Sequence, residues 1–183
     1  MKFLVVGNGK KISEELKSKI SSLNFDYILI VGDNENLDFF DNLGKKGFII
    51  YSEKKIKNNF VNLLLFKRRK IKIKGYTLVG LSGIKPKQEM LKGKNIQWES
   101  NLHLLLKNSK KTIILTHNSP YDDNILKEQI LLHKPLISIF RHKEQNKDFL
   151  KETLLICPGD LDKKEFLLLE ILNEKNINTE FFN

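Results

Sequence analysis

Side chains that could bind a metal recur in this sequence shortly after apolar runs. Asp33, His117 and His142 each stand two residues after such a run. One carboxylate and two imidazoles are a usable ligand set for a divalent ion such as Mn, Zn or Fe. Glu53 and Glu144 stand in loops of the same kind and are candidate additional ligands. The spacing therefore predicts a metal site, provided that the chain brings these loops together.

Basic residues in or near the same loops add a second kind of chemistry. Lys54 and Arg141 could stabilise a negative charge. Lys10 and Lys11 come just before a predicted helix, whose first backbone N–H groups attract anions. We therefore expect Lys54 and Arg141 to be candidate catalytic residues, and Lys10 and Lys11 to be anion-binding residues.

The first third of the chain predicts strands that alternate with helices. Short apolar runs at 3–6, 28–31 and 48–51 predict strands, because two of them end at glycine and none has a helical period. Residues 11–23 and 35–43 show apolar side chains at helical spacing. Strands separated by helical crossovers pair in parallel, so the carboxyl ends of these strands should share one edge of a sheet.

The rest of the chain mixes both kinds of pairing. Lysine and isoleucine alternate before Gly75, so residues 61–66 and 69–80 predict antiparallel strands with one wet face. Further strands are predicted at 112–115, 135–140, 154–156 and 165–171, and helices at 97–107 and 123–132. The sequence therefore predicts one α/β domain over residues 1–183.

Composition narrows the class of protein. With 183 residues and 40% hydrophobic side chains, the chain can bury a sizeable core. A single cysteine, Cys157, excludes an internal disulfide framework and a cysteine-based zinc cluster. No run reaches the roughly 20 apolar residues that a membrane helix needs, and the first apolar run is too short for a secretory signal. We expect a soluble cytoplasmic protein with no membrane partner.

The net charge of +10 raises the question of nucleic-acid binding. All but three of the 32 basic residues are lysine, which favours AT-rich codon usage over selection for phosphate recognition by arginine. The strongest basic patch is Lys67, Arg68, Arg69 and Lys70. These residues either contact a nucleic-acid backbone or protect an edge strand from pairing with another chain.

Taken in chain order, these motifs resemble those of the calcineurin-like metallophosphoesterases. Gly32-Asp33 matches the family's G-D motif, and His117 lies in a THNSP segment like the family's isolated histidine motif. His142 matches half of the family's G-H-x-H motif, and Pro158-Gly159 matches its closing turn. The resemblance implies an α/β four-layer sandwich, with two mixed sheets face to face and helices outside, and a phosphoester-hydrolysing site with two metals.

Three motifs depart from the family pattern. Gly7-Asn8-Gly9 stands where D-x-H is expected, Ser52-Glu53-Lys54 where G-N-H is expected, and Glu144 where the last histidine is expected. The resemblance then implies a reduced site with at most one divalent ion, or none, and weak phosphoester hydrolysis. The alternative is a catalytically silent scaffold whose basic surface binds a protein partner or nucleic acid. The remaining histidines, His103 and His133, are expected to be structural or exposed.

Overall fold

A computed structural model describes the chain except for residues 53–55, 57–58, 84–91 and 108–110. Two of the predicted site residues, Glu53 and Lys54, lie outside the described residues. Of the stretch 92–96 only the backbone is described.

Twelve strands in the described part of the chain form two six-stranded sheets. The first sheet has the order β12 (Asn176–Phe182), β11 (Phe166–Asn173), β1 (Lys2–Val6), β2 (Tyr27–Val31), β3 (Gly47–Ile50) and β4 (Leu63–Leu65). The second has the order β5 (Arg68–Ile73), β6 (Tyr76–Leu81), β7 (Thr112–Thr116), β8 (Ile137–Phe140), β10 (Thr153–Cys157) and β9 (Asn146–Leu150).

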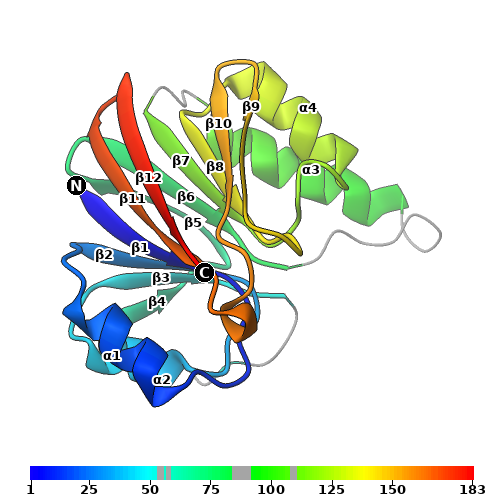
Figure 1. The fold of residues 1–183 in the computed structure, drawn as a ribbon. Helices are drawn as coiled ribbons and strands as arrows, with labels where there is room; N and C mark the ends of the chain where they lie inside the picture. The colour runs from blue at the N-terminus through cyan, green and yellow to red at the C-terminus, as the bar shows by residue number, and fades with distance from the viewer. Residues whose placement is uncertain (53–55, 57–58, 84–91, 108–110) are drawn as a thin grey trace.

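The sheets stack face to face and helices cover their outer sides (Figure 1). Helices α1 (Glu14–Ser22) and α2 (Leu37–Asn42) lie against the first sheet. Helices α3 (Lys92–Leu106) and α4 (Asn124–His133) lie against the second, and a short 3-10 helix, η1 (Leu161–Lys163), follows β10. This is the four-layer α/β sandwich that the sequence predicted.

Alternating side chains divide the core into an inner layer and two outer layers. In β1, Phe3 and Val5 face the second sheet, while Leu4 and Val6 face α1 and α2. Each of these four side chains is completely buried, which is what a strand covered on both faces requires. The near-continuous apolar runs of the sequence follow from this double coverage.

The carboxyl ends of the parallel strands of both sheets meet along one rim of the sandwich. Strands β1, β2 and β3 run parallel in the first sheet, and β6, β7, β8 and β10 run parallel in the second. A hydrogen bond from the backbone N–H of Gly83 to the carbonyl oxygen of Tyr51 (2.9 Å) joins the end of β6 to the end of β3. Residues after these strand ends therefore share one neighbourhood, which we call the rim.

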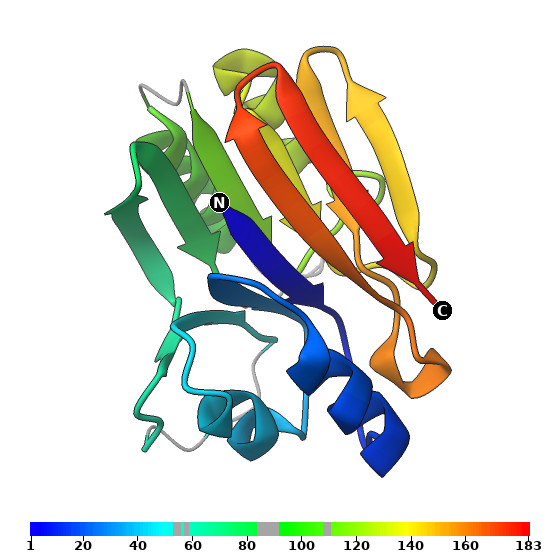
Figure 2. The same cartoon turned by 60° about the vertical axis from the view of Figure 1, so that its left-hand side comes forward.

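The structure differs from the predicted elements mainly at the edges. Strands β9 and β12 were not predicted, and both are outermost strands with several exposed residues (Figure 2). Strand β4 pairs in parallel with β3, so only β5 and β6 form the expected antiparallel pair. Among the described helices, none is long and apolar enough to span a lipid bilayer.

Candidate anion site at the strand ends

Asp33 is held at the rim by the ends of three strands. Its backbone N–H donates to the side-chain oxygen of Asn8 (2.9 Å), which follows β1. Its carboxylate accepts the Ser52 backbone N–H at Oδ1 (3.0 Å) and the Ser52 hydroxyl at Oδ2 (2.7 Å). Ser52 follows β3 and is buried. Both carboxylate oxygens of Asp33 are therefore engaged by the protein itself.

His117 lies close to Asp33 and to Arg141. It follows β7, and Thr116 before it pairs with Phe140, which precedes Arg141 at the end of β8. Burial lowers the pKa of His117, and the guanidinium of Arg141 lowers it further, while the Asp33 carboxylate opposes both. Above its ordinary titration range, His117 is thus a neutral imidazole within electrostatic reach of a carboxylate and a guanidinium.

The lowered pKa makes His117 a source of pH-dependent stability. The unfolded chain takes up the proton first, because its histidine titrates near 6.5 and the folded one at a lower pH. Stability from this group is present above pH 6.5 and decreases as the pH falls below that value. We expect His117→Gln to flatten the dependence of urea unfolding on pH between about 7.5 and 5. His133→Gln is the comparison variant. It should flatten the same dependence, because burial also lowers the pKa of His133. An unchanged slope in His117→Gln would contradict this assignment.

His142 is fixed by its backbone and by its ring. The Cys157 thiol donates to the carbonyl oxygen of His142 (3.6 Å). The imidazole packs edge to face on Tyr121, with 5.9 Å between ring centroids. Tyr121 donates its hydroxyl to Asp148 (3.1 Å), and burial is the main cause that raises the pKa of Tyr121 to about 12. The ring of His142 is thus placed by its contact with an aromatic side chain.

The described ligand candidates do not gather into one cluster of metal-binding side chains. Within the described part of the chain, no group of three or more His, Cys, Asp or Glu side chains is placed to hold a metal ion. Asp33, His117 and His142 follow neighbouring strand ends, but Ser52 engages the Asp33 carboxylate that would bridge two ions. Glu144 is exposed after β8. Metal binding by this set stays a prediction.

The segment that replaces the expected D-x-H motif is closely packed. A Cβ atom on Gly7 would lie 2.0 Å from the carbonyl oxygen of Gly159, in the turn after β10. A Cβ atom on Gly9 would lie 3.0 Å from Cβ of Leu161 and 3.2 Å from the side-chain nitrogen of Asn34. Neighbouring backbone therefore fills the space beside Gly7 that a side chain would need.

Lys10 and Lys11 lie apart from the helix start that was expected to bind an anion. Helix α1 begins at Glu14, after the N-cap Ser13. The backbone N–H groups of Lys10 and Lys11 donate to the carboxylate of Asp162, at 2.8 and 3.4 Å. The carboxylate of Asp162 thus accepts the backbone N–H groups of both residues. Binding of an anion from solution by the two exposed lysine side chains stays a prediction.

The basic patch from Lys67 to Lys70 lies at and just before the start of edge strand β5. Arg68 donates to the side-chain oxygen of Asn101 (2.7 Å), and Lys70 donates to the carbonyl oxygen of Lys107 (3.2 Å). These bonds attach two of the basic side chains to the α3 side of the sheet. The position on an unpaired edge agrees with protection of that edge, and nucleic-acid binding there stays a prediction.

Asp123 positions the loop that follows β7, and the sequence did not single it out as a site residue. It is buried, caps α4 through the backbone N–H of Leu126 (3.2 Å), and accepts hydrogen bonds from Trp98 (3.1 Å) and Asn118 (3.0 Å). The last of these donors is the residue after His117. The sequence signal is a capping residue before a helix, which is common at surfaces and does not reveal the tertiary partners.

Asp123→Ala is expected to destabilise the protein by about 2–3 kcal/mol, because it removes a helix cap and leaves the buried donor of Trp98 and the half-buried donor of Asn118 without this acceptor. Denaturant unfolding measures the loss. Asp122→Ala, at the exposed neighbouring carboxylate, is the matched control and should change stability by less than about 0.5 kcal/mol. Equal effects of the two changes would show that Asp123 has no special part.

The remaining histidines contact each other on the outer helices. His103 of α3 and His133 of α4 approach to 3.0 Å between ring nitrogens. The sequence favoured structural or exposed roles for these residues and did not indicate their pairing.

Comparisons with known proteins rest on structure rather than sequence. The sequence matches no protein-family model, and no curated protein matches it significantly. Among solved structures, TT1561 of Thermus thermophilus superposes with a TM-score of 0.73 and 18% identity over 98% of this chain and 97% of that one. A predicted phosphoesterase from Streptococcus pneumoniae has a TM-score of 0.55 and 9% identity over 98% and 87% of the two chains. Vps29 from Entamoeba histolytica, solved with zinc, has a TM-score of 0.54 and 13% identity over 100% and 98%.

This chain has the calcineurin-like metallophosphoesterase fold. The strand order, the two facing sheets and the outer helices agree with that assignment, as the motif order predicted. Identities below a fifth show the fold alone. In this metallophosphoesterase fold the rim carries Asp33, His117 and Arg141 together.

Proposed function

We propose that this protein uses the rim of a metallophosphoesterase fold to bind a phosphate-type anion and does not hydrolyse phosphoesters with a two-metal centre. The observation that carries the proposal is the double engagement of Asp33. Its two carboxylate oxygens accept hydrogen bonds from Ser52, so the group that would bridge two ions already has partners. The closed space beside Gly7 supports the same conclusion.

Arg141 is the residue we assign to the anion. Its Nε is buried, and among the described residues it has no hydrogen-bond partner. A buried cationic donor without a partner is unfavourable, and an anion that accepts from it removes the penalty. The guanidinium can hold two oxygens of a phosphate group side by side. The neutral His117 beside it can donate or accept one further hydrogen bond.

Weak or absent catalysis follows from this arrangement. Two-metal hydrolysis depends on a water activated between the ions and on a clamp that holds the phosphoryl oxygens. Arg141 can supply part of the clamp, but the described rim residues do not place a second group that would activate water. Binding without turnover is the property of a scaffold, and the ligand is then a phosphoester or a phosphate group on a partner.

A second candidate function is a single-metal phosphoesterase of low activity. One observation favours it: His117 is neutral in the physiological range because burial lowers its pKa, and it lies near Asp33. A neutral imidazole next to a carboxylate is a competent pair of ligands. This candidate requires that an ion coordinate Asp33 through the lone pairs that the hydrogen bonds from Ser52 leave available.

Metal analysis and hydrolysis assays separate the two candidates. Purified protein is analysed for Mn, Zn and Fe, and then assayed with bis(p-nitrophenyl) phosphate in added Mn²⁺. We expect less than one metal per chain and no hydrolysis above the Asp33→Ala variant. Inorganic phosphate should bind in the presence of EDTA. Stoichiometric metal together with hydrolysis that Asp33→Ala abolishes would establish the second candidate, and failure of phosphate to bind would reject the first.

A further inference from the structure

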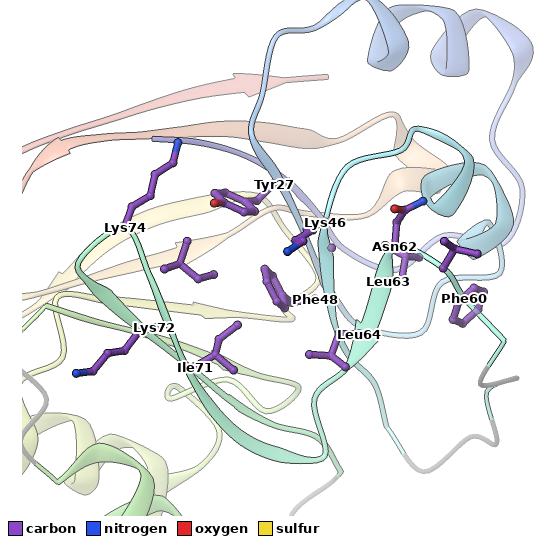
Figure 3. Close-up of a pocket in the computed structure, with 13 residues that line it drawn as sticks. Tyr27, Lys46, Phe48, Phe60, Asn62, Leu63, Leu64, Ile71, Lys72 and Lys74 are labelled. Atoms are coloured by element: carbon purple, nitrogen blue, oxygen red, sulfur yellow. The ribbon is translucent and has the colours of Figure 1, made fainter.

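A separate cavity lies at the end of the sandwich opposite the rim. It has a volume of about 590 Å³ and opens between the amino ends of β2 and β3, the edge strand β4 and the far end of β5 (Figure 3). Because β4 belongs to one sheet and β5 to the other, no described strand closes the sandwich at this side. The inner core is therefore accessible here from solvent.

The walls of this cavity are aromatic and aliphatic. Tyr27 and Phe48 stand on one side, and Leu64 and Ile71 stand on the other (Figure 3). The rings of Tyr27 and Phe48 are in contact, with 6.4 Å between centroids. Val61 at the border is 88% exposed. A hollow of this size matches the usual volume of a small-molecule site, and its mixed apolar and polar lining exposes surface that an amphiphilic ligand could bury.

The charged residues that line the cavity in the described part of the chain are all basic. Three lysines contribute to its lining, Lys46, Lys72 and Lys74, and no carboxylate does. Lys74 is partly neutralised, since it pairs with Asp26 (3.5 Å) and lies over the Tyr27 ring (5.8 Å). Among the described residues, Lys46 and Lys72 have no ion pair. Lys46 extends toward Tyr27 and Phe48, whereas Lys72 points away (Figure 3).

A smaller cavity continues the same surface along β4. It has a volume of about 360 Å³, shares Phe60, Leu63 and Leu64 with the first, and adds Lys67 and Arg69. The apolar floor along β4 is thus bordered by basic side chains in both directions. Both cavities thus place basic side chains beside apolar ones, which a single exposed hydrophobic residue would not do.

We infer that the cavity between β4 and β5 binds an anionic amphiphile, a molecule with an apolar body and a carboxylate or phosphate head. The apolar body would lie between Tyr27, Phe48 and Ile71, and the head would face Lys46. A cationic amphiphile would meet the lysines and be repelled. Nucleic acid does not match the floor, because its charged backbone gains little from an aliphatic hollow.

The test uses probes with the same chain and different heads. Laurate, dodecyl phosphate and dodecyltrimethylammonium are titrated by calorimetry into the whole protein, below their micelle concentrations. We expect laurate to bind with one site, dodecyl phosphate to bind with one site in the Arg141→Ala variant, where binding of its head group at the rim is weakened, and the cation not to bind. Binding by only one anion identifies its head group as the preferred source, and either pattern supports the inference. Equal binding of anion and cation, or no binding by any probe, would overturn it.

Variants locate the site. Lys46→Gln should weaken anion binding about fivefold or more. Lys45→Gln, at the exposed neighbour outside the cavity lining, should not.

Ile71→Trp should fill the cavity and abolish binding, and its thermal transition would confirm that the variant folds. If Ile71→Trp does not fold, the Lys46 and Lys45 pair decides. Equal effects of those two changes would refute the assignment, and so would unchanged binding in a folded Ile71→Trp variant. Arg141→Ala at the rim should leave laurate binding unchanged, which separates this site from the rim.

Discussion

Gly7→Ala is expected to destabilise the protein by about 3 kcal/mol, one of the two largest effects we predict. The added methyl would lie 2.0 Å from the carbonyl oxygen of Gly159, which is backbone and cannot rotate away. The turn cannot easily move either, because the carboxylate of Glu165 accepts the backbone N–H of Asp160, the residue after Gly159 (2.9 Å). Overpacking of this kind costs about 1–3 kcal/mol, and a clash with backbone belongs at the upper end. Denaturant unfolding measures the change.

Gly44→Ala is the matched control for this prediction. Gly44 has a positive φ of 68°, and no atom lies within 4 Å of the position that a Cβ would take there. Its substitution should therefore cost only the backbone term, about 1 kcal/mol. If the two variants lose equal stability, the space beside Gly7 is not closed as described.

The same clash predicts that the family motif cannot simply be restored. Gly7→Asp combined with Gly9→His would place the missing D-x-H side chains in the chain. We expect this variant to be destabilised at least as much as Gly7→Ala and to gain no bound metal. Metal analysis after dialysis checks the second part. Recovery of a stable, metal-loaded protein would show that the rim still accommodates a two-metal site and would count against the proposed function.

Arg141→Ala is expected to lower the affinity for inorganic phosphate by about tenfold or more, the largest effect we predict at the rim. A hydrogen bond between charged groups contributes about 1.5–3 kcal/mol, and about 1.4 kcal/mol corresponds to tenfold in affinity. Arg141→Lys should recover only part of the affinity, since an ammonium cannot hold two oxygens side by side. Calorimetric titration with EDTA present measures each constant.

A control variant and a stability measurement test whether the loss of phosphate affinity is specific to Arg141. Lys143→Ala removes an exposed positive charge two residues away and should change phosphate affinity much less than Arg141→Ala. Stability should stay nearly unchanged in Arg141→Ala, because the Nε of Arg141 has no partner among the described residues. Equal loss of affinity in the two alanine variants would mean that the rim attracts phosphate only through its overall charge.

Much of the fold could be predicted from the sequence because the central strands are covered on both faces. Residues 3–6 and 28–31 are continuous apolar runs, and in the structure all eight are completely buried. Such runs with helical segments between them require parallel pairing. The two strands that were missed, β9 and β12, lie at the edges, where β9 is mostly exposed and β12 alternates between exposed and half-buried positions. Their pairing depends on a neighbouring strand and leaves little trace in their own composition.

The candidate site was readable only in part. Motif order indicated Asp33, His117 and His142, and Arg141 was a candidate because it lies in the same loop as His142. These residues could be grouped because parallel strands bring their carboxyl ends to one edge. Motif order also indicated a metal site, and for this second prediction the local sequence was insufficient. The contact of Ser52 with Asp33 spans 19 residues, and Asp123 reaches Trp98 across 25. Bonds of this kind connect separate elements and have no periodic signal in the chain.

The sequence by itself determined which segments are strands and helices in the centre of the molecule, and that polar residues follow the strands. These features are local, since periodicity, glycine and capping residues act over a few neighbours. Only the tertiary structure decided that Ser52 occupies the carboxylate of Asp33, that Gly159 closes the space beside Gly7, and that β4 and β5 leave an apolar cavity open. The first depends on the pairing of β2 with β3 within one sheet, and the other two depend on how the two sheets pack against one another. In each case, atoms far apart in the chain come close in space.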